Sequence, residues 1–464
     1  MRLLPAIALV LFIAYADREP PPDARMKGAF RKPAENGWTY VHLEGAPAQI
    51  GFQHGFLLAP EIADAKEVIA LELKHDDRKD WAFFRDAART LLWPHIEREY
   101  REELQGIADG VSAKGVKIDI WDIVVMNAME EWSYYVKAYD AAHGIKSPPT
   151  TTAPDHCSAF VATGAYTKDG RVVMGHNNWT TYLDGERWTM IFDIAPSSGH
   201  HMLMDGFPGL IHSADDFGVN SAGIMVTETT ISNFSGWDSN GVPEFARARK
   251  ALQYSASIDD FDRIMRDGNN GGYANDWLVA DRKTNEIANL ELGLKNVTLE
   301  RSKDGYFVGS NIPINPKLLR EETDFPIADQ TTSQCTRHIR WEQLMRENKG
   351  GIDVAAGQRF LGDHLDTSSG KVQPSERTLC GHLELSKRGM GAWQPPYAPA
   401  GTVQNKVIDA SMAERMSFTA LVGHACGIPY KSQPHLNKHP EFAWQKELLR
   451  DLDPHNWTTF TAMR

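Results

Sequence analysis

The character of the sequence changes abruptly at Cys157, and this change limits what the chain can fold into. Between about residues 60 and 140, apolar residues recur at spacings of three and four, which is typical of amphipathic helices. A stretch with three prolines, residues 144–155, predicts an exposed linker. After Cys157 the pattern alternates as in strands and is broken by short turns. One chain therefore combines a helical N-terminal part with a sheet-rich remainder.

Turn sequences divide the part after Cys157 into hairpins. The first hairpin pairs residues 157–167 with 171–179 across Lys168, Asp169 and Gly170. Strands, then helices, then strands with short turns predict an α+β fold in which antiparallel sheets are covered by helices. The other predicted hairpins are 188–195 with 201–205, 210–219 with 224–230, 276–281 with 286–292, and 297–301 with 306–309, and the predicted helices are 242–254 and 258–266.

The first sixteen residues, MRLLPAIALVLFIAYA, have the layout of a secretory signal peptide cleaved after Ala16. The alternative is an uncleaved membrane anchor, which Pro5 and the short apolar stretch disfavour. We therefore expect an exported protein, in a periplasm, a lysosomal lumen or outside the cell. Glycosylation would apply only in a eukaryotic secretory pathway. The four N-x-S/T sequons lie at Asn178, Asn233, Asn296 and Asn456.

These boundaries divide the chain into a signal peptide at 1–16, a helical segment at 17–156 that ends in the linker, and a sheet-rich domain at 157–464. Its 49 basic and 61 acidic residues give a net charge of -12. Such a chain has no overall attraction to phosphate backbones, and we find no basic run with interleaved aromatic residues. A nucleic-acid partner is therefore not expected.

The cysteines are too few for a disulfide scaffold and allow at most two bridges. Their spacing matches no zinc-binding pair, so the sequence predicts neither a metal nor a cofactor. They are Cys157, Cys335, Cys380 and Cys426.

Common hydrolase motifs are missing: the sequence contains no G-x-S-x-G, H-E-x-x-H or G-x-x-x-x-G-K-[ST]. Cys157 is the best candidate nucleophile, because it opens a strand directly after a loop. Cleavage of the His156–Cys157 bond would give Cys157 a free α-amine with a pKa of about 7.7 to 8.0, a suitable general base. The alternatives are a structural or disulfide cysteine, or Cys426 in GHACG as the nucleophile.

Five further residues could complete such a site, and each has a simpler explanation. His176 falls near the cysteine across the first hairpin, or is a satisfied strand-end histidine. Asn275 could donate to an oxyanion, or belong to a glycine-rich turn. Arg337 could clamp substrate, or lie on a helix surface. Asp215 and Asp216 could be an acid pair, or a turn.

Several segments together resemble the phospholipase B-like family of N-terminal nucleophile hydrolases. They occur in family order and cover much of the chain from Cys157 to about Asn311. The segment 333–340 and the GVNSAGI run at Gly218 also resemble the wider group that includes penicillin acylases and acyl-coenzyme A:aminopenicillanate acyltransferase. The matching segments are HCSAF at His156, HNNW at His176, GFPGLIHSADDF from Gly206, MVTETTISN from Met225 and GGYANDWLVAD from Gly271.

The resemblance implies a four-layer αββα sandwich, with residues 157–464 as the catalytic domain. It also implies self-cleavage before Cys157 and non-covalent association of the two fragments, and it leaves a homodimer open. The implied catalytic residues are Cys157, His176, Asn275 and, from the wider group, Arg337. Trp179, Asp216 and Trp277, which lie in the matching segments, are expected to contact substrate.

The resemblance implies hydrolysis of acyl esters, with phospholipids as the expected substrate. The same catalytic steps serve amides, so an amidase or acyltransferase on N-acyl compounds is the alternative. A secreted lipid-binding protein of the same fold, without turnover, is a third reading. The intact set of Cys157, His176 and Asn275 argues against it, because a binding protein does not need these residues.

Overall fold

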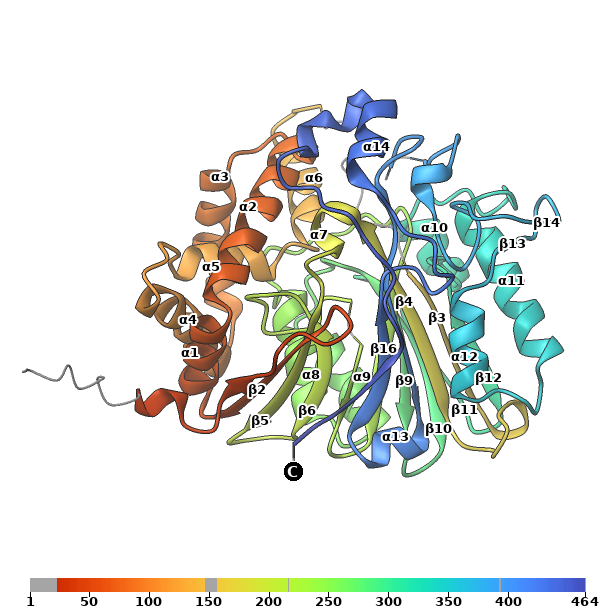
Figure 1. The fold of residues 1–464 in the computed structure, drawn as a ribbon, viewed down its shortest axis with the longest axis horizontal. Coiled ribbons are helices and arrows are strands. Elements are labelled where there is room, and N and C mark those ends of the chain that lie inside the picture. Colours follow the sequence, from red (N-terminus) through yellow and green to blue (C-terminus); the bar gives the residue numbers. More distant parts are fainter. Residues whose placement is uncertain (1–22, 147–156, 216, 392–393, 464) are drawn as a thin grey trace, which may run out of the picture.

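Two β-sheets face each other across a buried apolar core (Figure 1). The computed structural model describes residues 23–146, 157–215, 217–391 and 394–463. The expected signal peptide, most of the linker, His156 and Asp216 lie outside these residues. In the part of the chain that is described, no helix is both long enough and apolar enough to cross a membrane.

The first sheet has nine strands, in the order β1-β2-β5-β6-β7-β8-β9-β10-β11. All pairs are antiparallel except β2 and β5, which run parallel over seven residues. The strands are β1 (Phe30–Arg31), β2 (Thr39–Gly45), β5 (Met190–Pro196), β6 (Met202–Gly206), β7 (Gly218–Asn220), β8 (Ile224–Thr230), β9 (Asn275–Asp281), β10 (Glu286–Leu292) and β11 (Val297–Ser302).

The second sheet has six antiparallel strands, in the order β12-β3-β4-β15-β16-β17. A separate two-stranded ribbon, β13 with β14, lies in the connection between the helical layer and β15. The strands are β3 (Ser158–Thr163), β4 (Val173–Thr181), β12 (Gly305–Gly309), β13 (Leu365–Asp366), β14 (Lys371–Val372), β15 (Ala400–Asp409), β16 (Ser417–Val422) and β17 (Thr458–Thr461).

Helices cover the outer face of each sheet (Figure 1). On the nine-stranded sheet the cover comes from the N-terminal helices α1 (Pro47–Leu57), α2 (Ala59–Asp76), α3 (Trp81–Ala87), α4 (Arg98–Ala113), α5 (Ile120–Asn127) and α6 (Trp132–Ala142), with α8 (Glu244–Tyr254) and α9 (Ile258–Arg266). On the six-stranded sheet it comes from α11 (Ser333–Glu347) and α12 (Val354–Leu361). The shorter α-helices are α7 (Tyr182–Gly185), α10 (Pro316–Glu322), α13 (Ala410–Glu414) and α14 (Ser432–Lys438).

Three apolar cores separate these four layers, so the protein is an α+β fold with an αββα sandwich, as the sequence predicted. Phe192 and Trp277 belong to the core under the N-terminal helices. Val161 and Leu278 belong to the core between the sheets. Trp341 of α11 belongs to the core on the far side of the six-stranded sheet.

The N-terminal segment supplies more than helices, because β2 enters the nine-stranded sheet beside β5. One predicted pairing is wrong, and one predicted strand is too long, although it pairs with β8 as expected. Residues 297–301 and 306–309 do not form a hairpin: β11 pairs with β10, whereas β12 pairs with β3 in the other sheet. Residues 210–219 form a strand only at their end, since buried side chains of the loop bond one another there, as Ser213 does with Asp215.

Burial limits which sequons could carry a glycan. Asn178 is 2% exposed and Asn296 is 6% exposed, so neither can hold a bulky sugar in the folded chain. Asn456 is exposed and Asn233 is partly exposed. Glycosylation, if the chain meets the enzymes for it, is therefore expected only at the last two.

Candidate active site

Cys157 sits at the point where the described chain resumes and β3 begins one residue later. Its side chain is buried, at 1% exposure. Its φ angle of +91° lies in a region that non-glycine residues rarely adopt, which indicates backbone strain at this residue. The carbonyl oxygen of Cys157 accepts a hydrogen bond from Nη1 of Arg337 at 2.5 Å, so the strained residue is fixed in place.

The hairpin of β3 and β4 brings His176 close to Cys157. His176 pairs with Ala159, and the following Asn177 pairs with Ser158. The thiol of Cys157 donates to Oδ1 of Asn178 at 3.7 Å. Ligand atoms of Cys157, His176 and Glu228 all lie within 4.8 Å of one another. The proximity that the turn length predicted is therefore present in the structure.

Glu228 of β8 is the member of this group that the sequence analysis did not single out, although it lies inside the MVTETTISN segment. It accepts a hydrogen bond from the hydroxyl of Tyr273 at 3.1 Å. Burial, and then the charge of Glu228, raise the pKa of the Cys157 thiol well above its usual value. The thiol is therefore protonated at neutral pH and needs a base before it can attack.

His176 is a neutral imidazole in this setting. Burial, and then the positive charge of Lys406, lower its pKa well below the usual value. Neither ring nitrogen has a hydrogen-bond partner among the described residues, and Nδ1 lies 3.9 Å from Oδ2 of Asp215. A buried neutral imidazole of this kind can orient or exchange a proton with a neighbouring group.

Arg337 of α11 is fully buried and points into the site, so it is not a helix-surface arginine. Besides the Cys157 carbonyl, it donates to Ser158 Oγ at 2.9 Å, Asn311 Oδ1 at 2.8 Å and Ser333 Oγ at 3.0 Å. Its guanidinium carbon lies 4.4 Å from the centre of the Trp179 ring. These contacts tie α11 to the start of β3 and to the end of β4.

A buried ion cluster lies beside His176, between the two sheets. Lys406 of β15 contacts Asp205 at 2.9 Å and also contacts Asp215. Ser213 Oγ lies 2.8 Å from Oδ1 of Asp205 and 2.7 Å from Oδ1 of Asp215, within hydrogen-bond distance of both. Burial, and then repulsion from Asp205, raise the pKa of Asp215 well above its usual value. The loop after β6 is thereby fastened to the opposite sheet.

Comparison with protein families gives a match to the Phospholipase B model over residues 76–322, which is more than half of the chain. The chain belongs to the phospholipase B family. The match includes Cys157, His176 and Glu228, and begins well before the cysteine. It ends before Arg337, so the family match does not cover that residue.

Individual relatives are distant. The chain is similar to an uncharacterised protein of Archaeoglobus fulgidus (25% identity over 71% of this chain and 58% of that one) and to a phospholipase B of Crotalus adamanteus (22% identity over 61% and 54%). It is also similar to the 40 kDa form of acyl-coenzyme A:6-aminopenicillanic-acid-acyltransferase of Emericella nidulans (24% identity over 66% and 77%). The chain spans between half and three fifths of the length of the first two.

The remaining residues predicted for the candidate site of this phospholipase B family member differ in position. Asn275 begins β9, is fully buried, and neither atom of its amide has a hydrogen-bond partner in the described part of the chain. Trp277 packs edge-on against Phe261 of α9, in the core under the N-terminal helices. That position indicates a packing role and gives no support to a contact with substrate. Asp216 and His156 lie outside the described residues.

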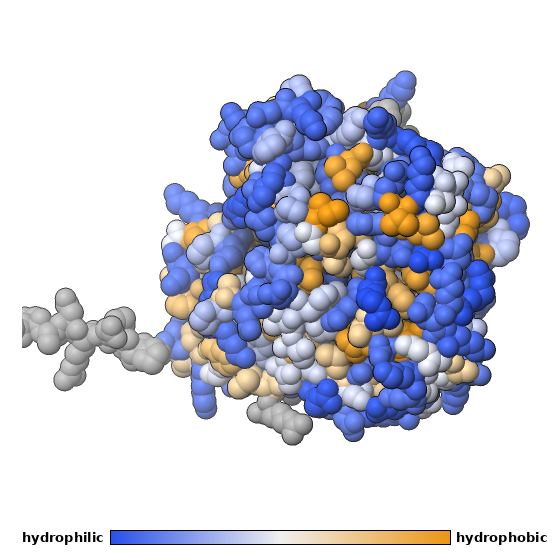
Figure 2. Space-filling view, turned by 45° about the vertical axis from the view of Figure 1, so that its right-hand side comes forward, coloured by the Kyte–Doolittle hydropathy of each residue, from blue (hydrophilic) through white to orange (hydrophobic). Residues whose placement is uncertain are grey.

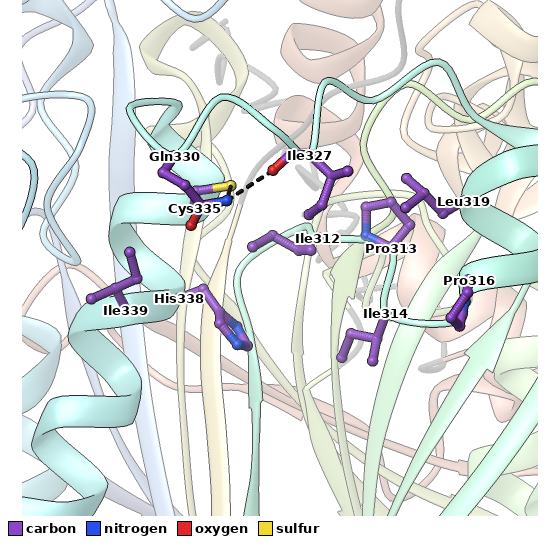
Figure 3. Close-up of a pocket in the computed structure, with 10 residues that line it drawn as sticks. All are labelled: Ile312, Pro313, Ile314, Pro316, Leu319, Ile327, Gln330, Cys335, His338 and Ile339. Carbon is purple, nitrogen blue, oxygen red and sulfur yellow. Dashed lines mark hydrogen bonds between the residues drawn. The ribbon is translucent and has the colours of Figure 1, made fainter.

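An apolar cavity of about 290 Å³ lies next to two of the site segments (Figure 3). It is bounded on one side by α11 and on the other by the chain after β12, which carries Ile312 directly after Asn311. The face that Figure 2 brings forward shows several separate apolar groups in a mainly hydrophilic surface. The cavity is lined by Ile312, Pro313, Ile314, Pro316, Leu319, Ile327, Gln330, Cys335, His338 and Ile339.

Proposed function

We propose that this chain is an exported, self-processing acyl hydrolase whose nucleophile is Cys157. The observation that carries the proposal is the environment of this residue. Cys157 is buried and strained at the junction of linker and strand. Its carbonyl is held by Arg337, and its thiol lies beside His176 and Glu228. A cysteine with only a structural role would not need this set of groups.

In the first phase, the Cys157 thiol attacks the carbonyl carbon of His156. The C–N bond to Cys157 breaks, a thioester forms, and the nitrogen of Cys157 takes up the proton lost by the thiol. Water then hydrolyses the thioester, leaving a carboxylate on His156 and both a thiol and a free α-amine on Cys157. The positive φ angle supports this step, because breaking the bond relieves the strain.

In the second phase, the α-amine removes the proton from the thiol, whose raised pKa would otherwise keep it inactive. The thiolate attacks the acyl carbonyl, and the amide of Asn275 and backbone N–H groups stabilise the oxyanion. The ammonium returns the proton to the leaving group, and water releases the acid from the thioester. The buried, unpartnered amide of Asn275 supports its role, since it is available to donate.

The two fragments would remain associated without a covalent link. The N-terminal fragment contributes β2, which pairs with β5 over seven residues, and the helices α1 to α6 that bury one face of the sheet. Cleavage after His156 would leave these contacts intact. Export is supported by the apolar stretch at residues 1–16.

We expect an acyl ester of a phospholipid as the substrate. The family and relatives named phospholipase B support this choice, and so does the apolar cavity beside Asn311, which offers room for an acyl chain. An amidase or acyltransferase acting on N-acyl compounds is the second candidate, supported by the similarity to the aminopenicillanic-acid acyltransferase.

The test starts with the purified wild-type protein and the Cys157→Ala variant. We expect the wild type to run as two fragments, with a new N-terminus at Cys157, and to release fatty acid from phospholipid vesicles. The variant should stay one chain and release none. An unbroken wild-type chain, or hydrolysis that survives in the variant, would refute the proposal. Parallel assays with N-acyl amides decide between the two substrate classes.

A further inference from the structure

A second group of cysteines and histidines lies outside the Cys157 site. The ligand atoms of its four residues all lie within 4.8 Å of one another. The residues come from three separate connections: one precedes β13, two precede the 3-10 turn Leu383–Leu385, and one follows β16. They are His364, Cys380, His382 and Cys426.

The two distances from His382 to the cysteine sulfurs match those of a tetrahedral metal site. Nε2 of His382 lies 3.4 Å from Sγ of Cys426 and 3.6 Å from Sγ of Cys380. Zinc bound at about 2.3 Å to sulfur and about 2.0 Å to nitrogen, with tetrahedral angles, separates the two ligand atoms by about 3.5 Å. His382 therefore already lies at the distance from each of these two sulfurs that a shared zinc ion would set, and all four ligand atoms lie within 4.8 Å of one another.

The second ring nitrogen of His382, Nδ1, is also bonded as in zinc sites. This nitrogen lies 2.8 Å from Oε1 of Glu384, and the other carboxylate oxygen accepts a hydrogen bond from the Tyr182 hydroxyl at 2.6 Å. A carboxylate on Nδ1 fixes the tautomer in which Nε2 is free to bind a metal. His382 is fully buried, and the ring of His424 stacks on it at 4.0 Å.

We propose that His364, Cys380, His382 and Cys426 form a structural zinc site. Two thiolates and two imidazoles are the donor set that zinc prefers, whereas calcium and magnesium require oxygen ligands. Because all four ligands come from the protein, no position is left for water or substrate. The ion joins three connections, of which the first two are separated by the ribbon of β13 and β14 and the third follows β16.

The zinc site would also support the candidate active site, because the segment that carries two of its ligands packs against β4. Asn177 of β4 donates to the carbonyl of Leu379 at 2.6 Å, directly before the ligand Cys380. The indole of Trp179 packs so closely on Gly381 that a Cβ atom there would come within 2.2 Å of the ring. The ligand-bearing segment thus presses against the same strand that carries His176.

The competing arrangement is a disulfide between Cys380 and Cys426, which an exporting compartment would permit. Both cysteines are free in the structure. The two arrangements exclude each other, because a disulfide removes both thiolate ligands. They also differ by two hydrogen atoms in the mass of the chain, so a mass measurement separates them.

The test measures metal content, thiol state and ligand dependence on the full-length protein. We expect about one zinc ion per chain in the purified protein. We also expect the mass of the chain to be that of the form in which Cys380 and Cys426 are both reduced. Cobalt in place of zinc should give the intense visible absorption of a tetrahedral thiolate site. Cys380→Ser and His382→Ala should each reduce the zinc content to background. The matched control Cys335→Ser, a buried cysteine outside the group, should leave it unchanged.

The wild-type measurements decide the question even if a ligand variant fails to fold. Removal of zinc by a chelator should lower the melting temperature, and added zinc should restore it. A wild-type protein without stoichiometric metal would overturn the proposal. So would a Cys380–Cys426 disulfide in the native chain, or equal zinc in the wild type and a folded Cys380→Ser variant.

Discussion

The two cysteine–histidine groups of this protein lie close together but differ in what surrounds the sulfur. The group at Cys157 has one thiol, one imidazole and the carboxylate of Glu228. The proposed zinc group has two thiols and two imidazoles, and its carboxylate, Glu384, lies behind His382 rather than beside a sulfur. The position of the carboxylate therefore distinguishes the two groups. Glu228 lies near the thiol of Cys157 and disfavours its thiolate, whereas Glu384 contacts Nδ1 of His382 and makes this imidazole a stronger metal ligand.

The pKa shifts of the thiols differ within the proposed zinc group as well as between the two groups. Burial and Glu228 raise the pKa of Cys157. Hydrogen bonding to Cys380, and then to His364 and His382, lowers the pKa of Cys426 far below its usual value, although burial opposes the shift. Burial, and then the neighbouring Cys426, raise the pKa of Cys380 well above its usual value, so of these two sulfurs only Cys426 is shifted towards the thiolate.

Removing one sulfur from each group gives the clearest test of their different roles. Cys157→Ala should reduce self-cleavage and hydrolysis to the background rate and leave the zinc content unchanged. Cys426→Ala should lose the zinc and some thermal stability, and still carry the nucleophile. Fragment analysis, fatty-acid release and metal content are measured on both variants. If Cys426→Ala abolishes hydrolysis while keeping its fold and Cys157→Ala does not, the roles have been assigned the wrong way round.

The buried ion cluster next to the Cys157 group should have the next largest effect. Lys406→Met leaves Asp205 and Asp215 buried without their cation, which should cost about 3–5 kcal/mol of unfolding free energy. Urea unfolding in the Cys157→Ala background, where both chains are expected to stay unbroken, measures this.

The control is Lys431→Met. Lys431 is 46% exposed and pairs with Asp451 and Asp453, so its loss should cost much less unfolding free energy than the loss of Lys406. Equal losses in the two variants would mean that the cluster beside His176 contributes no more than a surface ion pair.

The sequence predicts those parts of the fold that depend on local patterning. The bounds of β8, β10 and α9 agree with their predicted ranges, because period-2 and period-3.6 patterns and flanking turns define them. The strand β2 was missed, since its partner β5 lies about 150 residues further along and nothing local signals the parallel pairing. The pairing of β11 and β12 failed because a short turn there leads from one sheet to the other.

Site prediction shows the same limit. His176 was found near Cys157 because one hairpin joins them. Glu228 was missed, since an acidic residue within a buried strand is recognisable only when its neighbours are known. The proposed zinc ligands were also missed: the sequence rule looks for pairs of cysteines at short spacing, whereas Cys380 and Cys426 are brought together only by the fold.

The Gly381→Ala substitution tests whether a change in the segment that carries zinc ligands affects the Cys157 group. A Cβ atom at this position would overlap the indole of Trp179, so Gly381→Ala should cost about 1–3 kcal/mol through forced repacking. Because Trp179 also faces Arg337, hydrolysis should fall while zinc is retained. Thermal unfolding, activity and metal content are compared with Gly351→Ala, where a Cβ would meet only one atom at 3.4 Å. Unchanged activity in a destabilised Gly381→Ala protein would show that the groups act independently.

Glu228→Gln should have the smallest effect and addresses the carboxylate that distinguishes the two groups. The charge of Glu228 disfavours the Cys157 thiolate, and the same charge would stabilise a neighbouring ammonium on the α-amine. Its removal therefore lowers the pKa of both groups, so the acid limb of the kcat/KM profile should move to lower pH. The profile is recorded beside that of Glu342→Gln, a carboxylate bonded to Tyr306. A limb that stays in place, or moves to higher pH, would mean that the charge of Glu228 does not act on the nucleophile.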